Sequence, residues 1–225
     1  MGRHDCAAFW GGALPLMHQN DEDPLWDHIA RSLGKPAAAT CRPGFPFDES
    51  ALHDAAVLVP LVARQTGMHV IFTRRSEALK KHSGQISFPG GMLEPADDSP
   101  LAAALREAHE EIGLLSSRVR VLGALPRYPT ATGFMIHPFV GQVICADGLC
   151  ADPGEVAEIF EVPLGFFLDP ANHRPHHIEY DGQTYRLHAM PYEDYYIWGA
   201  TAAILRELYH CLRQGAPELL PSAVE

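Results

Sequence analysis

The stretch "LREAHEEIGL", Leu105 to Leu114, places three glutamates within five positions of a helix-forming sequence. At about 100° per residue, Glu107, Glu110 and Glu111 fall within about a 100° arc of the helix surface. Like charges three or four residues apart on a helix repel each other, so this arrangement costs free energy unless a cation offsets it. Arg106 lies one turn before Glu110 and can hold that carboxylate, but one arginine does not neutralise three acids.

The same segment carries clear start and stop signals for a helix over residues 100–112. Ser99 is a suitable N-cap before Pro100, and Gly113 is a suitable C-terminal cap. Just upstream, Gly90 and Gly91 allow a tight backbone path that leads the chain to the helix. Clustered carboxylates next to a glycine loop can bind Mg²⁺ or Mn²⁺, and the same ion can also bind the phosphates of a substrate. The alternative is an ordinary solvated acidic face.

The remaining pattern predicts strands interrupted by single helices. From Ala55 onward, short apolar runs rich in β-branched and aromatic residues are typical of strands. Two further helices are expected, "PLWDHIARSLG" ending at Gly34 and Trp198 to Gln214. The fold class is therefore α/β (α+β), with a mixed sheet and helices on its faces. The linker-like stretch "KPAAATCRPGFPFDES" divides an N-terminal extension with one helix, residues 1–50, from a main domain over residues 51–225.

Composition excludes several classes of protein. The formal net charge of -11 disfavours nucleic acid and anionic membranes as partners, and no apolar run reaches the roughly 18 residues of a membrane span. Five cysteines without a CxxC motif indicate neither a disulfide framework nor a thiolate metal site, and a cytoplasmic location is expected. The first fifty residues could cover the fold, mediate self-association or stay mobile, so a homodimer stays open.

The stretch "GGMLEPADDSPLAAALREAHEEIGL" resembles the Nudix box, which is written Gly, five residues, Glu, seven residues, then Arg-Glu-apolar-x-Glu-Glu-x-Gly-apolar. The second half matches at every fixed position from Arg106 to Leu114. In the first half, counting back from Arg106 puts Asp98 at the glutamate position and Met92 at the glycine position, while Gly91 comes one residue early. The coenzyme A pyrophosphatase branch of the family shows a loop longer by one residue in this way. Its flanking segments also resemble "IFTRRSEALKKHSGQISFPGG", "LPRYPTATGFMIHPFVG", "EVAEIFEVPL" and "YYIWGATAAIL".

The resemblance implies a Nudix-like α/β/α sandwich and an enzyme that splits the diphosphate bond of coenzyme A or its thioesters with Mg²⁺ or Mn²⁺. The products would be 3′,5′-ADP and 4′-phosphopantetheine or its acyl derivative. It implies that Glu107, Glu110 and Glu111 bind metal and that Arg106, Glu110 and Glu111 serve catalysis. Glu155 and Glu158 are candidates for the general base, although the segment "PGEVAEIFEV" could equally be an exposed acidic loop.

Substrate recognition is expected at two segments and at the glycine pair Gly90 and Gly91. The basic segment "TRRSEALKKH" could seat the 3′-phosphate of coenzyme A, or it could be a hairpin with solvated side chains. The segment "YPTATGF" could meet the ligand, or it could be a strand-entry turn. Trp198 and Tyr196 are expected in the core, and the three histidines of "NHRPHH" in a solvated loop rather than at a metal. The candidate substrate-binding residues are Arg74, Arg75, Lys80, Lys81, Gly90, Gly91, Tyr128, Thr130, Thr132, Gly133 and Phe134.

Two other functions remain compatible with the pattern. A Nudix pyrophosphatase for ADP-ribose or another nucleoside diphosphate derivative would have the same metal helix. A non-catalytic nucleotide-sensing module would keep the fold without turnover. Intact glutamates on the helix, together with Arg106, argue against the second alternative.

Overall fold

The structure is a computed structural model that describes residues 24–33, 45–78, 83–180 and 182–215. Its strands and helices follow the alternation that the sequence indicates. The strands are β1 (His53–Arg64), β2 (Gly67–Arg75), β3 (Ile86–Ser87), β4 (Gly90–Met92), β5 (Val119–Ala124), β6 (Tyr128–Pro129), β7 (Phe134–Val143), β8 (Val156–Pro163), β9 (Arg174–Tyr180), β10 (Gln183–Tyr192) and β11 (Tyr195–Trp198). The helices are α1 (Pro24–Leu33), α2 (Pro100–Ile112), α3 (Leu164–Leu168) and α4 (Gly199–Gly215).

Eight of the described strands form one mixed sheet with the order β3-β2-β1-β7-β5, to which β4, β6 and β8 add by pairing with β1, β7 and β2. The long central strands β1 and β7 run parallel, whereas the other pairs in this sheet are antiparallel. The pairing of β4 with β1 sets Gly91 opposite Ala56 and Gly90 opposite Val57. The glycine loop is thereby fixed to the middle of the sheet.

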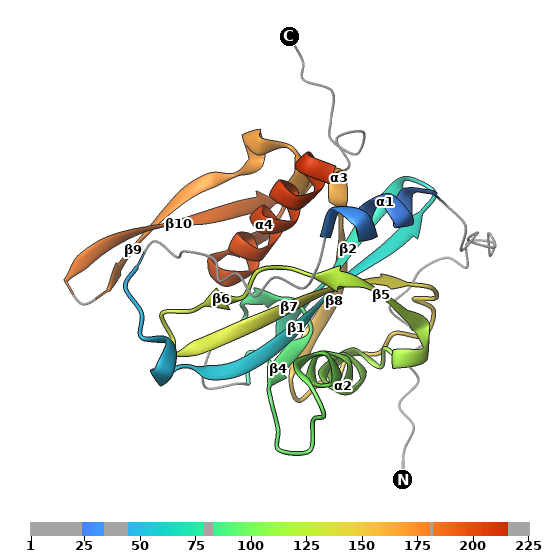
Figure 1. Ribbon diagram of the computed structural model, residues 1–225, viewed down its shortest axis with the longest axis horizontal. Coiled ribbons are helices and arrows are strands. Elements are labelled where there is room, and N and C mark those ends of the chain that lie inside the picture. The colour runs from blue at the N-terminus through green and yellow to red at the C-terminus, as the bar shows by residue number, and fades with distance from the viewer. Residues whose placement is uncertain (1–23, 34–44, 79–82, 181, 216–225) are drawn as a thin grey trace.

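Helices cover both faces of this sheet, as Figure 1 shows with α2 on one side and α1 and α4 on the other. Alternate residues of β1 divide between two cores because side chains of a strand point to opposite faces. Leu58 and Val62 pack with the apolar side of α2, and Val59 and Leu61 pack with the other helices. The predicted mixed α/β fold with helices on the faces of the sheet is confirmed. A second sheet, β11-β10-β9, projects beside α4.

Helix α1 belongs to the same core as α4. Trp26, Ile29 and Leu33 are buried in one apolar cluster with Leu205 and Leu208. The extension proposed for residues 1–50 stays a prediction, but its helix is packed into the main hydrophobic core. Burying Trp26 and Ile29 contributes about 2 to 3 kcal/mol each to folding.

The local sequence signals located most elements and missed some. Helix α2 has the predicted bounds, with the Ser99 side chain accepting a hydrogen bond from the Ala102 amide and Gly113 in the left-handed conformation. The histidine segment, expected as a loop, instead forms the start of β9, because its backbone pairs with β10. The five cysteines were expected to form no disulfide framework, but Cys150 is disulfide-bonded. No helix in the described part of the chain is long and apolar enough to cross a membrane.

Candidate active site

Two glycines bring the β4 backbone against the acidic side of α2. Gly90 has φ 157°, and a Cβ there would lie 2.7 Å from Val57 Cα, so a side chain does not fit between β4 and β1. A Cβ at Gly91 would overlap the carboxylate of Glu107. The Gly90 amide donates a hydrogen bond of 3.3 Å to Oε2 of Glu111. The glycine pair therefore makes room for carboxylates directly beside the main chain.

Glu111 is a buried acid at the bottom of this site. Its side chain is 2% exposed, and its Oε1 lies 3.6 Å from an Arg75 guanidinium nitrogen. The pKa of Glu111 is raised to about 8, chiefly by burial and also by the charges of Glu107 and Glu155, against the lowering effect of the Gly90 amide and Arg75. A carboxylate with only these partners costs free energy when ionised, so the site favours an additional positive charge.

Glu107 lies one turn earlier on the same face. Burial raises its pKa above the usual range, Arg106 lowers it, and the charges of Glu110 and Glu155 raise it. Glu110 is the outermost of the three acids, with a side chain that is 56% exposed. The repulsion inferred from "LREAHEEIGL" is therefore present between neighbouring carboxylates of the folded protein.

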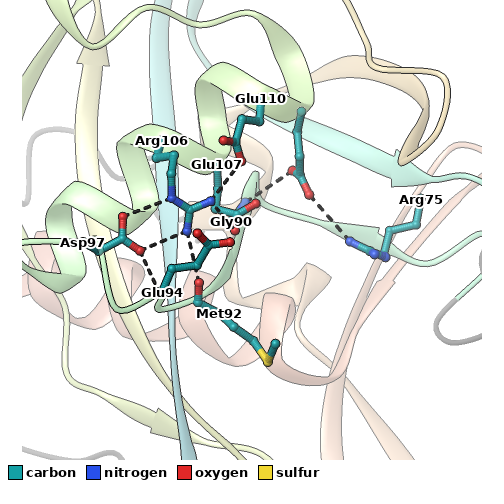
Figure 2. Close-up of polar contacts among 9 residues, drawn as sticks. Arg75, Gly90, Met92, Glu94, Asp97, Arg106, Glu107 and Glu110 are labelled. Carbon is teal, nitrogen blue, oxygen red and sulfur yellow. Dashed lines mark hydrogen bonds and ion pairs between the residues drawn. The ribbon is translucent and has the colours of Figure 1, made fainter.

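Arg106 holds several of these groups in place (Figure 2). One terminal nitrogen donates to Oε1 of Glu107 and to Oε2 of Glu110, each at 2.9 Å. The Nε and the other terminal nitrogen donate to both carboxylate oxygens of Asp97 at 3.0 Å, and the latter nitrogen also reaches the Met92 carbonyl at 3.2 Å. The acidic partners raise the pKa of Arg106, so it remains a fixed cation.

The acid that pairs with Arg106 is Asp97, and Asp98 is exposed. Counting back from Arg106 selected Asp98, whereas counting six residues forward from Gly91 reaches Asp97, so the additional residue lies between Asp97 and α2. Asp97 also accepts a hydrogen bond of 2.8 Å from the Glu94 amide, which ties the loop to the helix. The Arg106 guanidinium holds the pKa of Asp97 below its usual range.

The carboxylate oxygens fit a divalent ion by their chemistry and position. Mg²⁺ and Mn²⁺ prefer oxygen ligands, and Glu107 and Glu111 offer them at adjacent turns beside a strand with no side chain in the way. Within the described residues, His, Cys, Asp and Glu side chains form no preformed cluster of three, and Glu107 and Glu110 each contact the same nitrogen of Arg106.

The two candidates for the general base differ in their surroundings. Glu155 is exposed in the turn directly before β8, and its charge raises the pKa of both Glu107 and Glu111, so it lies near the acidic site. Glu158 instead accepts a hydrogen bond of 2.8 Å from the Tyr195 hydroxyl and pairs with Arg74 at 2.9 Å. The assignment of either residue as base stays a prediction.

A cavity of about 370 Å³ opens on the side of β4 away from the acids. Arg75, Gly90 and Gly91 border both the cavity and the acidic site. Gly133 has φ 90° in the turn directly before β7. Arg74 forms a salt bridge with Glu158. Lys80 and Lys81 lie outside the described residues. The candidate substrate residues that line the cavity are Arg75, Gly90, Gly91, Tyr128, Thr130, Thr132 and Phe134.

Sequence reasoning missed the far wall of this cavity. Trp198, expected in the core, is half-buried and lines the cavity together with Ile178 and Leu187. Tyr196, also expected in the core, is 48% exposed, so that prediction was wrong. Strand periodicity alone could not show that residues of the second sheet line the same cavity as the glycine strand.

An α/β sandwich with an acidic helix beside paired glycines is the arrangement expected of a pyrophosphohydrolase, and this chain has it. A model of the NUDIX domain matches residues 52–180 of this chain. The uncharacterized Nudix hydrolase NudL of Enterobacter sp. (strain 638) is 40% identical over 168 residues, which are 74% of this chain and 86% of that protein. NudL of Escherichia coli (strain K12) is 43% identical over 155 residues, 68% of this chain and 80% of that protein. The chain belongs to the Nudix hydrolase family.

A solved structure agrees with this fold. The crystal structure of a MutT/nudix family protein from Enterococcus faecalis has 15% sequence identity to this chain and a TM-score of 0.50. The match covers 76% of this chain and 65% of that one. At this identity the likeness concerns the fold alone.

Proposed function

We propose that the protein hydrolyses the diphosphate bond of coenzyme A or its thioesters, producing 3′,5′-ADP and 4′-phosphopantetheine or its acyl derivative. The observation that carries the proposal is the glycine strand β4, which has the acids of α2 on one side and a cavity on the other. A diphosphate at the acids can therefore extend one arm into a binding site. The segments around the Nudix box that resemble the coenzyme A pyrophosphatase branch support the choice of substrate.

In this proposal Glu107 and Glu111 are the principal metal ligands, and Glu110 is a further ligand or positions the water. When bound, Mg²⁺ or Mn²⁺ neutralises charge on the phosphoryl oxygens and lowers the pKa of a bound water. The raised pKa of Glu107 and of Glu111 supports the assignment, because carboxylates that repel each other gain most from an added cation.

Arg106 and Asp97 act as positioning residues in the same mechanism. Arg106 fixes the direction of Glu107 and Glu110, and its bidentate contact with Asp97 prevents it from turning away. Glu155 is the better placed of the two candidate bases, since its charge acts on both metal-binding glutamates. It would accept the proton of the attacking water as that water bonds to phosphorus.

The basic segment is the proposed seat of the 3′-phosphate. Arg74 and Arg75 lie at the end of β2, where both already contact acids of the protein. Lys80 and Lys81 follow shortly after in the sequence, and together these residues make a positive segment in a chain with a net charge of -11. A small-molecule substrate and a cytoplasmic location complete the proposal, and nucleic acid and membranes are not proposed as partners.

Product analysis tests this function. The full-length protein is incubated with Mg²⁺ or Mn²⁺ and with coenzyme A, acetyl coenzyme A or ADP-ribose, and the products are separated chromatographically. We expect 3′,5′-ADP from both coenzyme A compounds at rates well above the cleavage of ADP-ribose. Preferred cleavage of ADP-ribose would assign the alternative pyrophosphatase function. Tight binding of coenzyme A without turnover at any metal concentration would assign the sensing function.

A further inference from the structure

The cavity beside β4 has apolar walls that the proposed chemistry at the acids does not explain. Its volume of about 370 Å³ lies within the range of about 300 to 1,000 Å³ that is usual for small-molecule sites. Its walls come from segments distant in the sequence, which the fold brings together over the glycine strand. The principal apolar side chains are Phe45, Tyr128, Phe134, Ile178, Leu187 and Trp198.

Charge and hydrogen bonding in the lining disfavour a phosphorylated occupant. Among the described lining residues Arg75 is the single charged side chain, and it is paired with Glu111. The hydroxyl of Thr201 donates to the Ile86 carbonyl at 3.0 Å, and the Thr130 hydroxyl accepts from the Phe134 amide at 2.9 Å. A phosphate monoester placed here would lose its hydration without gaining a free cation, whereas an apolar chain would gain from leaving water.

The border between the cavity and the acids is a single strand. Gly90 and Gly91 line the cavity and also contact Glu111 and Glu107, respectively. Met92 follows on the rim with 57% exposure, and its carbonyl accepts a hydrogen bond from Arg106. A diphosphate held at the acids is therefore separated from the cavity by this one strand, whose two glycines border both.

We infer that this cavity receives the acyl-pantetheine arm of the substrate, so that thioesters with longer acyl chains bind more tightly than free coenzyme A until the cavity is full. The inference rests on the proposed function and adds the identity of the arm that the cavity takes. The adenosine arm, with its additional phosphate, stays outside the apolar cavity.

Phosphate-free probes test the cavity separately from catalysis. Binding of pantetheine, S-butanoyl pantetheine and S-hexanoyl pantetheine to the intact protein is measured by calorimetry with EDTA present. The expected gain is about 4-fold in affinity per added methylene, until the cavity is filled. Equal affinity across the series would overturn the inference. Displacement of the acylated probe by 3′,5′-ADP would also overturn it, because the nucleotide arm would then occupy the cavity.

A matched pair of variants locates the probe. Ile178→Glu introduces a carboxylate into the cavity wall, and Val121→Glu makes the same change on the exposed strand β5, away from the cavity. We expect the first variant to lose at least about 10-fold in affinity for S-hexanoyl pantetheine and the second to bind like the wild type. Circular dichroism verifies that both variants are folded. If Ile178→Glu unfolds, Trp198→Ala replaces it as the lining variant and is measured with the same probe. Equal affinity in the folded lining variant and in Val121→Glu would contradict the inference.

The two proposals fail in different ways. A protein that binds the acylated probes but never cleaves coenzyme A would refute the proposed function and leave the cavity assignment standing. A protein that cleaves coenzyme A, but whose affinity for the probes does not depend on acyl length, would refute the cavity assignment alone.

Discussion

Glu111→Gln is expected to stabilise the metal-free protein increasingly as the pH rises. The side chain is 2% exposed, and burial raises its pKa from 4.5 to about 8. The folded state therefore holds this proton more tightly than the unfolded state. The resulting contribution to stability is fully present below pH 4.5 and is lost as the pH rises through about 8. Glutamine has nearly the same shape, can still accept the hydrogen bond from Gly90, and does not ionise.

The size of the effect follows from the shift in pKa. One pKa unit corresponds to about 1.4 kcal/mol, so the shift from 4.5 to about 8 amounts to roughly 5 kcal/mol in total. Between about pH 5 and about pH 9, the free energy of unfolding of the wild type should fall relative to Glu111→Gln by roughly 4 kcal/mol. Arg75 already offsets part of the charge of Glu111, and the pKa of about 8 includes that contribution.

The assay is urea unfolding at several pH values with EDTA present, followed by the same series with Mg²⁺. We expect the difference between the two proteins to grow with pH in EDTA and to shrink with Mg²⁺, which binds the ionised wild type more tightly. Glu110→Gln is the matched control, because Glu110 is on the same helix but 56% exposed, and its effect should stay within about 0.5 kcal/mol. Parallel pH profiles for the wild type and Glu111→Gln would refute the reasoning.

Three further outcomes follow from the site. Asp97→Asn should lower both the free energy of unfolding and kcat, since it breaks a bidentate pair, whereas Asp98→Asn should behave like the wild type in both measurements. Gly91→Ala should lower kcat about 100-fold with a small change in Tm, because the new Cβ displaces the adjoining carboxylate; wild-type turnover would contradict that packing. Glu155→Gln should lower kcat by about 100-fold or more with little change in Tm, while Glu158→Gln should mainly lower Tm; the reverse pattern would exchange their roles.

The metal helix was readable from the sequence because its signals are local. Ser99 and Gly113 define the ends of α2 by capping, and the spacing of Glu107 and Glu111 alone puts them on one face. The mixed sheet with helices on both faces also followed from short-range patterns, since β-branched runs and single helices alternate along the chain.

The partner of Arg106 was not readable from local spacing. Asp97 and Asp98 are adjacent and chemically identical, and only the path of the loop, tied by the Glu94 amide, decides which one turns toward the guanidinium. The far wall of the cavity depends on long-range pairing in the same way. Ile178 reaches it because β9 pairs with β10, a contact that "NHRPHH" alone does not indicate.

The most direct test of the central claim, that the glutamates of α2 bind divalent metal, is a Mn²⁺ titration followed by electron paramagnetic resonance. Free Mn²⁺ gives a sharp signal that decreases on binding, so uptake is counted without turnover. We predict that the wild type takes up Mn²⁺ near pH 8 and that the double variant Glu107→Gln, Glu111→Gln loses at least about 100-fold in affinity. An unchanged free Mn²⁺ signal with the wild type, or equal uptake by both proteins, would contradict the claim.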